Sequence, residues 1–578
     1  MSVSPEDRDL IYALTLDNAV KYGGKPSKGA VIGKFLHLRP EYKPRVKEIL
    51  PVIEEVVAEV AALGPERQAE ELERYRHLLP ERPARRAEEE LPPLPGAERG
   101  RVVTRFAPNP DFVLHLGSVR PLLLSYMYAR KYEGRFILRF EDTDPRTKRP
   151  RPEYYRMILE DLRWLGVEPD EMYYQSDRLE LYYDVARELI RRGAAYVCTC
   201  SPEEFSALAR EGRPCPHRNQ SPGENMSMFD EMLAGGYGEG EAVLRIKTDL
   251  SHPNVSVRDW PALRIIDTGK YPHPRVGSRY RVWPLYNYSC AVDDHYMGVT
   301  HVIRGAEHLV NEEKQKYVYM HMGWEPPVAI HHGRVAIPDG VLSKSKILAG
   351  IRRGVYSGID DPQLATLAAL RRRGFRPEAI RRVVLRGGLK ASLMTIDWSL
   401  LAAENRAIVD REANRYFGVR EPVPAWFPCE RELVARPRRH PSDPSRGERE
   451  IRVVPEEGRA EVYLERGDVG RLSPGAQVRL IALGNFRVAG VSGRGVELEY
   501  VDNDVERAKR EGLPFLHWVP KSHSIRLELL YPGRSYAGVG EGNLLSESVD
   551  RVVQLERVGF FRVDSVSSGS VTLVYAHD

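Results

Sequence analysis

An apolar run from Val102 to Phe106 opens a strand-and-helix pattern in the middle of the chain. A loop rich in Pro, Asn and Asp follows, and from about Gly117 apolar residues recur at helical spacing. After Gly134 a second apolar run, Arg135 to Phe140, predicts a second strand. The pattern therefore predicts a β-α-β unit, the building block of sheets that bind nucleotides.

The two ends of the chain show different patterns. Apolar residues between Ile49 and Val60 fall on one helical face, so residues 1–80 predict an N-terminal helical appendix. Residues 81–100 are charged and rich in proline, which is typical of a linker. Residues 355–415 predict helices. From residue 416 onward, short alternating runs separated by turns predict β-barrel strands.

Composition narrows the class of protein. A chain of 578 residues is too long for one core, and 42% hydrophobic with 29% charged residues describes a soluble multidomain protein. We find no apolar run long enough to span a membrane and expect a cytoplasmic location. Five cysteines, an odd number, indicate a reducing compartment rather than a disulfide scaffold.

The net charge of the chain excludes few classes of protein. The net charge is +4, and most basic residues are arginines, which suit phosphate contacts but also follow from a GC-rich genome or a hot habitat. The basic stretch from Arg436 to Arg449 predicts a flexible, solvated loop, with a loop that contacts RNA as the alternative.

The loop of the β-α-β unit carries candidate chemistry. At the predicted start of the helix, free N–H groups and the positive dipole end can receive a polyphosphate. His115 supplies donors there, and Gly117 lets a nucleotide approach the backbone. An ordinary turn with a surface histidine is the alternative. Directly after the second strand, Glu141 and Asp144 come where carboxylates of parallel sheets face the ligand crevice.

A second candidate site contains sulfur ligands. Cys198 and Cys200 are followed, after a hairpin-sized segment, by Cys215 and His217. Three sulfurs and one imidazole at such spacing can hold a tetrahedral Zn²⁺, which would be structural because all four positions are filled. Two buried thiols without a metal are the alternative.

Four stretches together carry a resemblance to a known family. They are 105–118, 138–145, 283–288 with 302–305, and 341–346. In this order they resemble the class I aminoacyl-tRNA synthetases that charge glutamate and glutamine, with 105–118 as the HIGH signature and 341–346 as the KMSKS signature. The stretch 27–33 and the predicted C-terminal barrels are similar to archaeal-type glutamyl-tRNA synthetases, and the resemblance covers most of the chain.

The resemblance implies roles for individual residues. His115 and Lys344 would be catalytic. The residues implied in ATP binding are Asn109, His115, Gly117, Ser118, Arg334, Val335, Ser343 and Lys344. The residues implied in amino-acid binding are Arg105, Glu141, Tyr286, Cys290 and Arg304. Some members also carry a zinc site with similarly spaced cysteines in the inserted domain, so the resemblance implies zinc at Cys198, Cys200, Cys215 and His217.

Arg304 distinguishes the two amino acids. A glutamate γ-carboxylate needs a charge-assisted, bidentate partner, which an arginine provides. The neutral amide of glutamine would leave a buried guanidinium uncompensated. Arg304 therefore indicates glutamate, and a strand-end arginine paired with Glu307 or a phosphate is the alternative.

The resemblance also implies the fold, a multidomain α/β and β architecture. A Rossmann-type catalytic domain would take residues 101–175 and 285–333, interrupted at 176–284 by a domain that binds the tRNA acceptor end. The central sheet is expected to resume at Val282 to Tyr288 and at Val299 to Arg304. The KMSKS-like loop, carrying Lys344, and helices would occupy 334–415, and anticodon-binding β-barrels 416–578.

The implied activity is that of a glutamyl-tRNA synthetase. Glutamate, ATP and Mg²⁺ would yield glutamyl-adenylate, and the glutamyl group would pass to the 3′ end of tRNA(Glu). Whether tRNA(Gln) is also charged is left open, and a monomer is favoured. A glutaminyl-tRNA synthetase and a non-catalytic tRNA-binding scaffold on the same fold are the alternatives.

Three residues depart from the family pattern. Val341 replaces the first lysine of the KMSKS signature, as in glutaminyl relatives. Phe112 replaces a glycine that commonly precedes the signature histidine, and Ser118 replaces the final histidine. A turn with positive φ would strain a phenylalanine, so we expect the loop to follow another path. A serine can still donate to phosphate.

Overall fold

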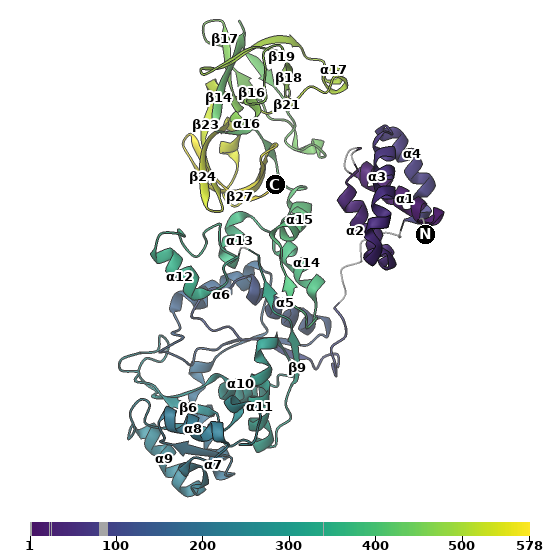
Figure 1. The fold of residues 1–578 in the computed structure, drawn as a ribbon. Coiled ribbons are helices and arrows are strands. Elements are labelled where there is room, and N and C mark those ends of the chain that lie inside the picture. The colour runs from purple at the N-terminus through teal and green to yellow at the C-terminus, as the bar shows by residue number, and fades with distance from the viewer. Residues whose placement is uncertain (1–2, 22–23, 25, 80–90, 339) are drawn as a thin grey trace. The chain divides into compact units, whose positions relative to one another are not determined.

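The computed structural model describes residues 3–21, 24, 26–79, 91–338 and 340–578 (Figure 1). Residues 81–90 of the predicted linker lie outside this part of the chain. The chain divides into two compact units, Met1–Glu90 and Leu91–Asp578. No helix in the described part is long and apolar enough to cross a membrane.

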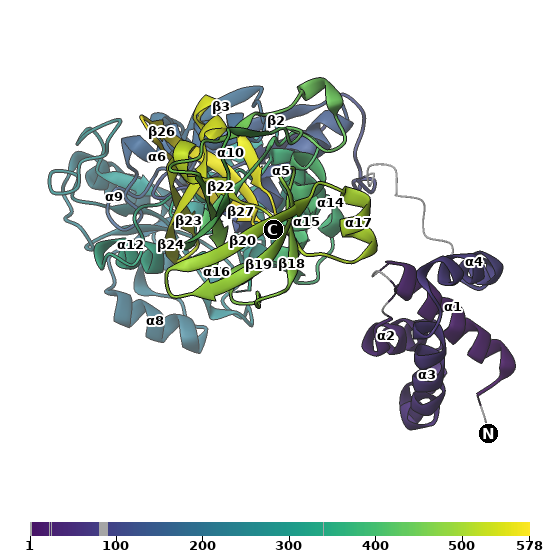
Figure 2. The same ribbon diagram turned by 90° about the horizontal axis from the view of Figure 1, so that it is seen from above.

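The first unit is helical, as its periodicity predicts. It consists of α1 (Pro5–Lys21), α2 (Lys28–Leu38), α3 (Val46–Ala61) and α4 (Pro65–Tyr75). Helix α1 contacts the other three, as Figure 2 shows. Ile49, Ile53, Val56 and Val60 of α3 are fully buried against α1 and α2, so the predicted apolar face is the core of this unit.

A five-stranded parallel sheet lies at the centre of the second unit, in the order β3-β2-β1-β8-β9. Its strands are β1 (Val103–Phe106), β2 (Arg135–Phe140), β3 (Glu171–Tyr174), β8 (His301–Gly305) and β9 (Val328–His332). The chain runs outward from β1 to β3 and then returns to the other side of β1 as β8. The β1/β8 boundary is therefore a topological switch point, where open α/β sheets form their ligand crevice.

Helices connect these parallel strands. They are α5 (Leu116–Lys131), α6 (Pro152–Trp164), α10 (Tyr286–Tyr296) and α11 (Leu309–Met322). Helix α5 follows β1, as predicted, and its Leu122, Leu123 and Leu124 are fully buried in the core beneath the sheet.

A second, antiparallel sheet interrupts the first, in the order β4-β5-β6-β7. This segment contains α7 (Leu179–Arg191), β4 (Ala195–Cys198), α8 (Pro202–Glu211), α9 (Pro222–Ala234), β5 (Val243–Ile246), β6 (Pro261–Ile265) and β7 (Val282–Pro284).

The expectation that the central sheet resumes at Val282 to Tyr288 is wrong. Strand β7 pairs with β6 of the antiparallel sheet, and Tyr286 is already the first residue of α10. A short apolar run does not by itself tell which sheet a strand joins, or whether it continues as a helix. The central sheet resumes only at β8, so the second expected place, Val299 to Arg304, is confirmed.

Four further helices follow the parallel sheet: α12 (Lys344–Arg352), α13 (Leu367–Arg373), α14 (Pro377–Gly387) and α15 (Trp398–Val409). Strand β10 (Val335–Ala336) pairs with β11 (Met394–Thr395) beside α5. Lys344 was predicted on a loop but is the first residue of α12, with Ser343 as the N-cap.

Two seven-stranded sheets form the C-terminal part. The first contains β12 (Arg415–Tyr416), β13 (Gly418–Arg420), β23 (Ser524–Tyr531), β24 (Arg534–Glu541), β25 (Val552–Leu555), β26 (Gly559–Ser567) and β27 (Ser570–His577). The second contains β14 (Pro422–Pro428), β17 (Arg459–Glu465), β18 (Gln477–Leu480), β19 (Gly484–Ser492), β20 (Gly495–Asp502), β21 (Phe515–Leu516) and β22 (Val519–Pro520). The short pair β15 (Leu433–Ala435) and β16 (Ile451–Val453) lies beside them.

Helix α13 joins the first of these sheets to the rest of the unit. Arg372 Nη2 lies 2.9 Å from Asp564 Oδ2, and Arg373 donates to the carbonyl of Ala576 at 2.7 Å.

The basic stretch from Arg436 to Arg449 is not wholly solvated. Arg449 is 1% exposed, and its guanidinium donates to Glu541 and Glu556 at 3.0 and 2.9 Å. His440 is also buried and contacts the carbonyl of Asp410. Local charge density could not reveal these partners, because both glutamates come about a hundred residues later.

Candidate active site

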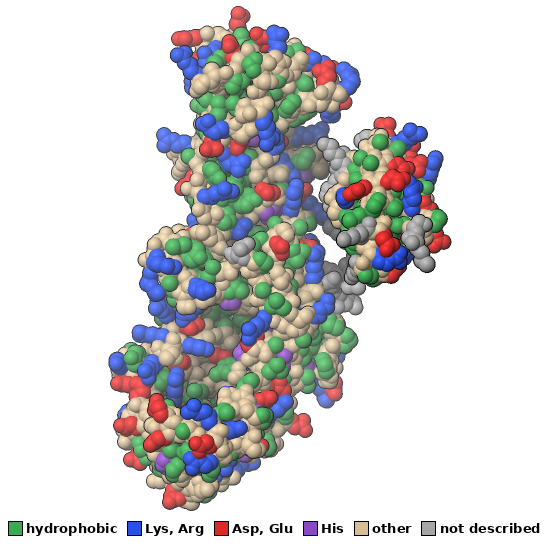
Figure 3. Space-filling view, in the orientation of Figure 1, with side chains coloured by type: hydrophobic (Ala, Val, Ile, Leu, Met, Phe, Trp, Pro, Cys, Tyr) green, Lys and Arg blue, Asp and Glu red, His purple; other side chains and the backbone are tan. Residues whose placement is uncertain are grey.

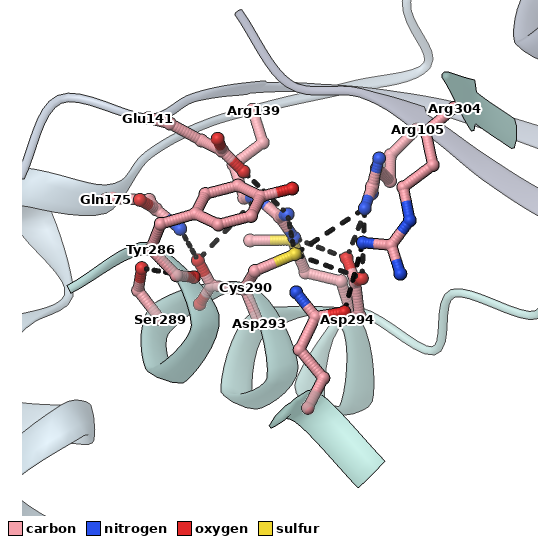
Figure 4. Close-up of polar contacts among 12 residues, drawn as sticks. Arg105, Arg139, Glu141, Gln175, Tyr286, Ser289, Cys290, Asp293, Asp294 and Arg304 are labelled. Carbon is pink, nitrogen blue, oxygen red and sulfur yellow. Dashed lines mark hydrogen bonds and ion pairs between the residues drawn. The ribbon is translucent and has the colours of Figure 1, made fainter. Parts of the chain in front are cut away.

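One face of α10 forms the floor of the candidate site. Tyr286, Cys290 and Asp294 are spaced by four residues, so their side chains project from the same side of the helix (Figure 4). Asp293 fixes this helix from another side: it accepts hydrogen bonds from Gln175, Arg178 and Tyr182 at 2.7 to 2.9 Å. The floor is therefore anchored to elements that precede the inserted sheet.

Asp294 pairs with two buried arginines. Arg105 on β1 donates to both carboxylate oxygens, at 3.1 and 3.2 Å, and Arg139 on β2 donates at 2.6 Å. Burial alone would raise the pKa of Asp294, but Arg105 and then Arg139 hold it well below its usual range. Asp294 is thus shared by two guanidinium groups, both 5% exposed or less. Arg139 also pairs with Glu141 at 3.2 Å and with Asp293 at 3.8 Å.

Glu141 lies at the other side of Arg139. Its Oε1 accepts from Arg139 Nη2 at 3.2 Å, and burial nonetheless raises the pKa of this carboxyl. Burial, followed by the charge of Asp294, raises the pKa of the Cys290 thiol to about 11, so it is a neutral group here. Figure 4 shows Tyr286 lying between Glu141 and Cys290.

Arg304, at the end of β8, differs from Arg105 and Arg139 in its hydrogen-bond partners. Its guanidinium is 5% exposed and donates from Nη1 to Gln315 Oε1 at 3.0 Å and from Nε to His331 Nε2 at 3.3 Å. Among the residues described, no carboxylate lies within 4.0 Å of it, so the alternative pairing with Glu307 is not formed. Arg304 is therefore a buried cation bonded to neutral acceptors.

The loop before α5 carries the HIGH-like residues. His115 is the N-cap of α5, and its Nδ1 lies 3.4 Å from Ser118 Oγ; burial lowers the pKa of this imidazole. A Cβ on Gly117 would lie 2.9 Å from the His115 ring, so glycine makes room for that ring. Asn109 Oδ1 is buried and has no hydrogen-bond partner in the described part of the chain.

Phe112 is accommodated without strain. Its backbone does not have a positive φ, and its ring packs against Tyr154 with centroids 5.8 Å apart. It belongs to a buried cluster with Ile347 of α12 and Leu364. The loop takes another path than a glycine turn, as expected.

The KMSKS-like segment lies against this loop. Lys344 Nζ is 2.6 Å from Asp111 Oδ2, and Leu342 comes within 3.6 Å of a Cβ built on Gly117. Ser343 Oγ contacts Ser345 Oγ at 3.1 Å. The structure therefore brings Lys344 and His115 to neighbouring segments, although they are far apart in sequence.

Arg334 and Val335 follow β9. Val335 pairs in β10 and packs against the core beneath α5. The side chain of Arg334 is 72% exposed and lies 3.7 Å from Glu307. Both residues are near α5, but Arg334 is oriented by a surface ion pair rather than by the buried network.

The cysteine cluster is assembled as the spacing predicts. The ligand atoms of Cys198, Cys200, Cys215 and His217 all lie within 4.8 Å of one another. Cys198 and Cys215 sulfurs are 3.8 Å apart, and Cys200 Sγ is 3.4 Å from His217 Nδ1. The hydrogen bond between Cys198 and Cys215 lowers the pKa of Cys198 to about 7 and raises that of Cys215 to about 12.

Comparison with known proteins assigns the family. The sequence profile described as tRNA synthetases class I (E and Q), catalytic domain, matches residues 101–411. The chain belongs to this family. Two profiles for the anti-codon binding domain of the same synthetases match residues 413–502 and 515–564, within the two C-terminal sheets.

Curated relatives of this class I synthetase match over nearly their whole length. The chain is 49% identical to the glutamate–tRNA ligase of Pyrococcus horikoshii over 97% of this chain and 98% of that protein. It is 50% identical to the glutamate–tRNA ligases of Thermofilum pendens, over 97% and 98%, and Pyrobaculum calidifontis, over 99% and 100%.

The sequence reasoning missed several residues of this synthetase's site. Arg139, Asp294, Gln315 and His331 all contact a predicted site residue. Two signals were available: an arginine inside the apolar strand β2 and the acidic pair at 293–294, directly after the apolar run 290–292 of a helix. Buried charges of this kind require partners.

Proposed function

We propose that this class I synthetase is a glutamate–tRNA ligase, which activates glutamate with ATP and transfers it to tRNA(Glu). The names of its nearly full-length relatives support this. The observation that carries it is the environment of Arg304, a buried guanidinium whose hydrogen-bond acceptors are both neutral.

The charge balance of the pocket favours a dicarboxylic amino acid. Arg105 and Arg139 share Asp294, whereas Arg304 has its charge available for a ligand. A γ-carboxylate beside Arg304 compensates that charge, and a γ-amide does not. Glu141 has a raised pKa because it is buried, and an α-ammonium group beside it would stabilise its ionised form.

The HIGH-like and KMSKS-like residues are proposed to bind ATP. In the tautomer whose Nδ1 accepts from Ser118, His115 carries its proton on Nε2 and can donate to a phosphate oxygen. Asn109 has a free carbonyl oxygen to offer a ligand, and Arg334 and Val335 are proposed to contact adenine. Ser343 and Lys344 begin α12, where N–H groups and the ammonium favour an anion.

These groups suit a reaction of two consecutive nucleophilic displacements. The α-carboxylate of glutamate attacks the α-phosphorus of ATP, and the bond to the leaving pyrophosphate breaks as Lys344 neutralises its charge. A hydroxyl of the terminal adenosine of tRNA then attacks the carbonyl carbon, and AMP leaves. Mg²⁺ supplies further compensation of phosphate charge. The side chains of this chain contribute mainly placement and electrostatic stabilisation.

The remaining parts are proposed to hold the tRNA. Residues 176–284 would bind the acceptor end and residues 416–578 the anticodon, with 334–415 between them. Figure 3 shows Lys and Arg side chains over α12, where Lys346, Arg352 and Arg353 are exposed and could meet the phosphate backbone. Whether tRNA(Gln) is also charged stays an open question, and free cysteines in the described chain fit a cytoplasmic enzyme.

The cysteine cluster is proposed to hold one structural Zn²⁺. Tetrahedral bonds of about 2.3 Å to sulfur place two sulfurs about 3.8 Å apart. The Cys198 and Cys215 sulfurs have this separation, so the donor set fits the ion in number, type and spacing. With four protein ligands, the ion would stabilise the inserted domain and take no part in the reaction.

The test is ATP–pyrophosphate exchange with tRNA(Glu) present and either glutamate or glutamine. We expect exchange with glutamate, lost in Arg304→Ala and retained in Arg163→Ala, which removes an exposed arginine of α6. Exchange with glutamine alone would assign the glutaminyl activity instead. Absence of exchange with either amino acid would identify a non-catalytic tRNA-binding protein.

A further inference from the structure

Two neutral side chains hold Arg304, and their arrangement deepens the proposed function, on which this inference rests. Gln315 comes from α11 and His331 from β9, so the guanidinium is held from two directions. We propose that Gln315 and His331 are positioning residues that set the preference for glutamate, because they orient Arg304 without neutralising it.

The chemistry of a guanidinium fixes which atoms face it. It has only donors, so only the Oε1 atom of Gln315 can lie 3.0 Å from Arg304 Nη1. His331 must likewise offer an unprotonated Nε2, and its proton then lies on Nδ1, 3.5 Å from Glu312 Oε2. The imidazole thus separates Arg304 from Glu312, and the carboxylate does not reach the guanidinium.

A small pocket lies beside the amide of Gln315. Its side chain is 6% exposed, and a cavity of about 20 Å³ lies next to it, lined also by Arg304 and Tyr319. Gln315 Nε2 and Tyr319 Oη are both buried without another partner in the described chain. The cavity has room for one water molecule, which would accept from Nε2 and bond the tyrosine hydroxyl.

Comparison with Arg105 and Arg139 shows why the partners of Arg304 must be uncharged. Asp294 compensates Arg105 and Arg139, and those two guanidinium groups are structural parts of the pocket. A carboxylate at position 315 would do the same for Arg304. The pocket would then hold no excess positive charge for a γ-carboxylate, and glutamate would lose its advantage over glutamine.

The experiment is Gln315→Glu, which changes the charge but hardly the shape. In exchange assays with tRNA(Glu), we expect KM for glutamate to rise about tenfold with kcat nearly unchanged, because the lost interaction exists before the transition state. KM for glutamine should not rise, so the glutamate-to-glutamine ratio of kcat/KM falls about tenfold. A purely structural role would impair both amino acids equally.

Two further variants complete the design. Met320→Glu adds the same charge on the same helix at a side chain that is 62% exposed, and it should match wild type. Gln315→Met removes the acceptor without adding charge, and it should raise KM for glutamate several-fold even if Gln315→Glu does not fold.

The outcomes separate the two proposals. If KM for glutamate in a folded Gln315→Glu, or in Gln315→Met, equals that of the wild type, the positioning role is overturned. Glutamate exchange by the wild type would still uphold the proposed function. Absence of glutamate exchange in the wild type itself would overturn the proposed function, and this inference with it.

Discussion

Lys344 Nζ lies 2.6 Å from Asp111 Oδ2, so an ion pair links the start of α12 to the loop before α5. The side chains are 37% and 17% exposed, which makes this a partly solvated contact. In the proposed mechanism Lys344 moves to the phosphates, and the pair must break when ATP binds. Asp111 therefore competes with the nucleotide for the lysine.

Asp111→Asn should accordingly strengthen ATP binding. An exposed ion pair contributes up to about 1 kcal/mol, so the KM for ATP is expected to fall about two- to fivefold. Steady-state exchange at varied ATP measures this. Asp184→Asn, which removes an exposed partner of Arg187, is the control and should leave the KM unchanged. A higher KM for ATP in Asp111→Asn would show that the carboxylate assists binding instead.

Phe112, in the same loop, packs against α12 through apolar contacts. Phe112→Gly restores the glycine usual in the family, but we expect it to release Ile347 and the α12 segment. Loss of a buried aromatic ring costs about 3 kcal/mol. Trypsin should then cut faster at Lys344, Lys346 and Arg352, and KM for ATP should rise, whereas Phe112→Leu should do neither. Wild-type proteolysis in Phe112→Gly would contradict the packing role.

Asp294→Asn should destabilise the catalytic domain strongly. It leaves Arg105 and Arg139 buried without their shared carboxylate, at a cost of about 3–5 kcal/mol. Urea unfolding at pH 7 measures the loss. Asp170→Asn, which breaks a pair with Arg130 that is more than a third exposed, should cost about 1 kcal/mol or less. Equal losses in the two variants would refute the network.

The same carboxylate predicts acid sensitivity. Its folded-state pKa lies below the unfolded value of about 4, so it contributes stability at every pH above about 4. That contribution disappears as the pH falls through the lowered folded-state pKa. Below pH 4 the stability difference between wild type and Asp294→Asn should therefore shrink. A constant difference down to pH 2 would argue against a lowered pKa.

Metal analysis tests the cysteine cluster. We expect about one zinc per chain by elemental analysis, near zero in Cys215→Ser, and a lower melting temperature after chelation. Cys429→Ser is the matched control, because Cys429 is a free cysteine outside the cluster. Metal-free wild-type protein with an unchanged melting temperature would support the alternative of buried thiols alone.

Local sequence patterns were sufficient to predict the elements and the site whose determining contacts are local. Strands β1 and β2, helix α5 and the face of α3 follow from periodicity in short windows, and the four residues of the cysteine cluster lie within one short segment. The resemblance then supplied roles for Arg105, Glu141 and Arg304, which stay predictions until the variants above are measured.

Only the tertiary structure decided which charges meet. Arg105 and Asp294 are 189 residues apart, and no periodicity relates them. The partners of Arg304 come from a helix and a strand whose register depends on the whole sheet. The sequence likewise did not show which of the two sheets β7 joins, that Arg449 is buried, or that the partners of Arg304 are neutral. Local preferences of the chain set its elements, whereas packing between distant elements sets which charges lie together.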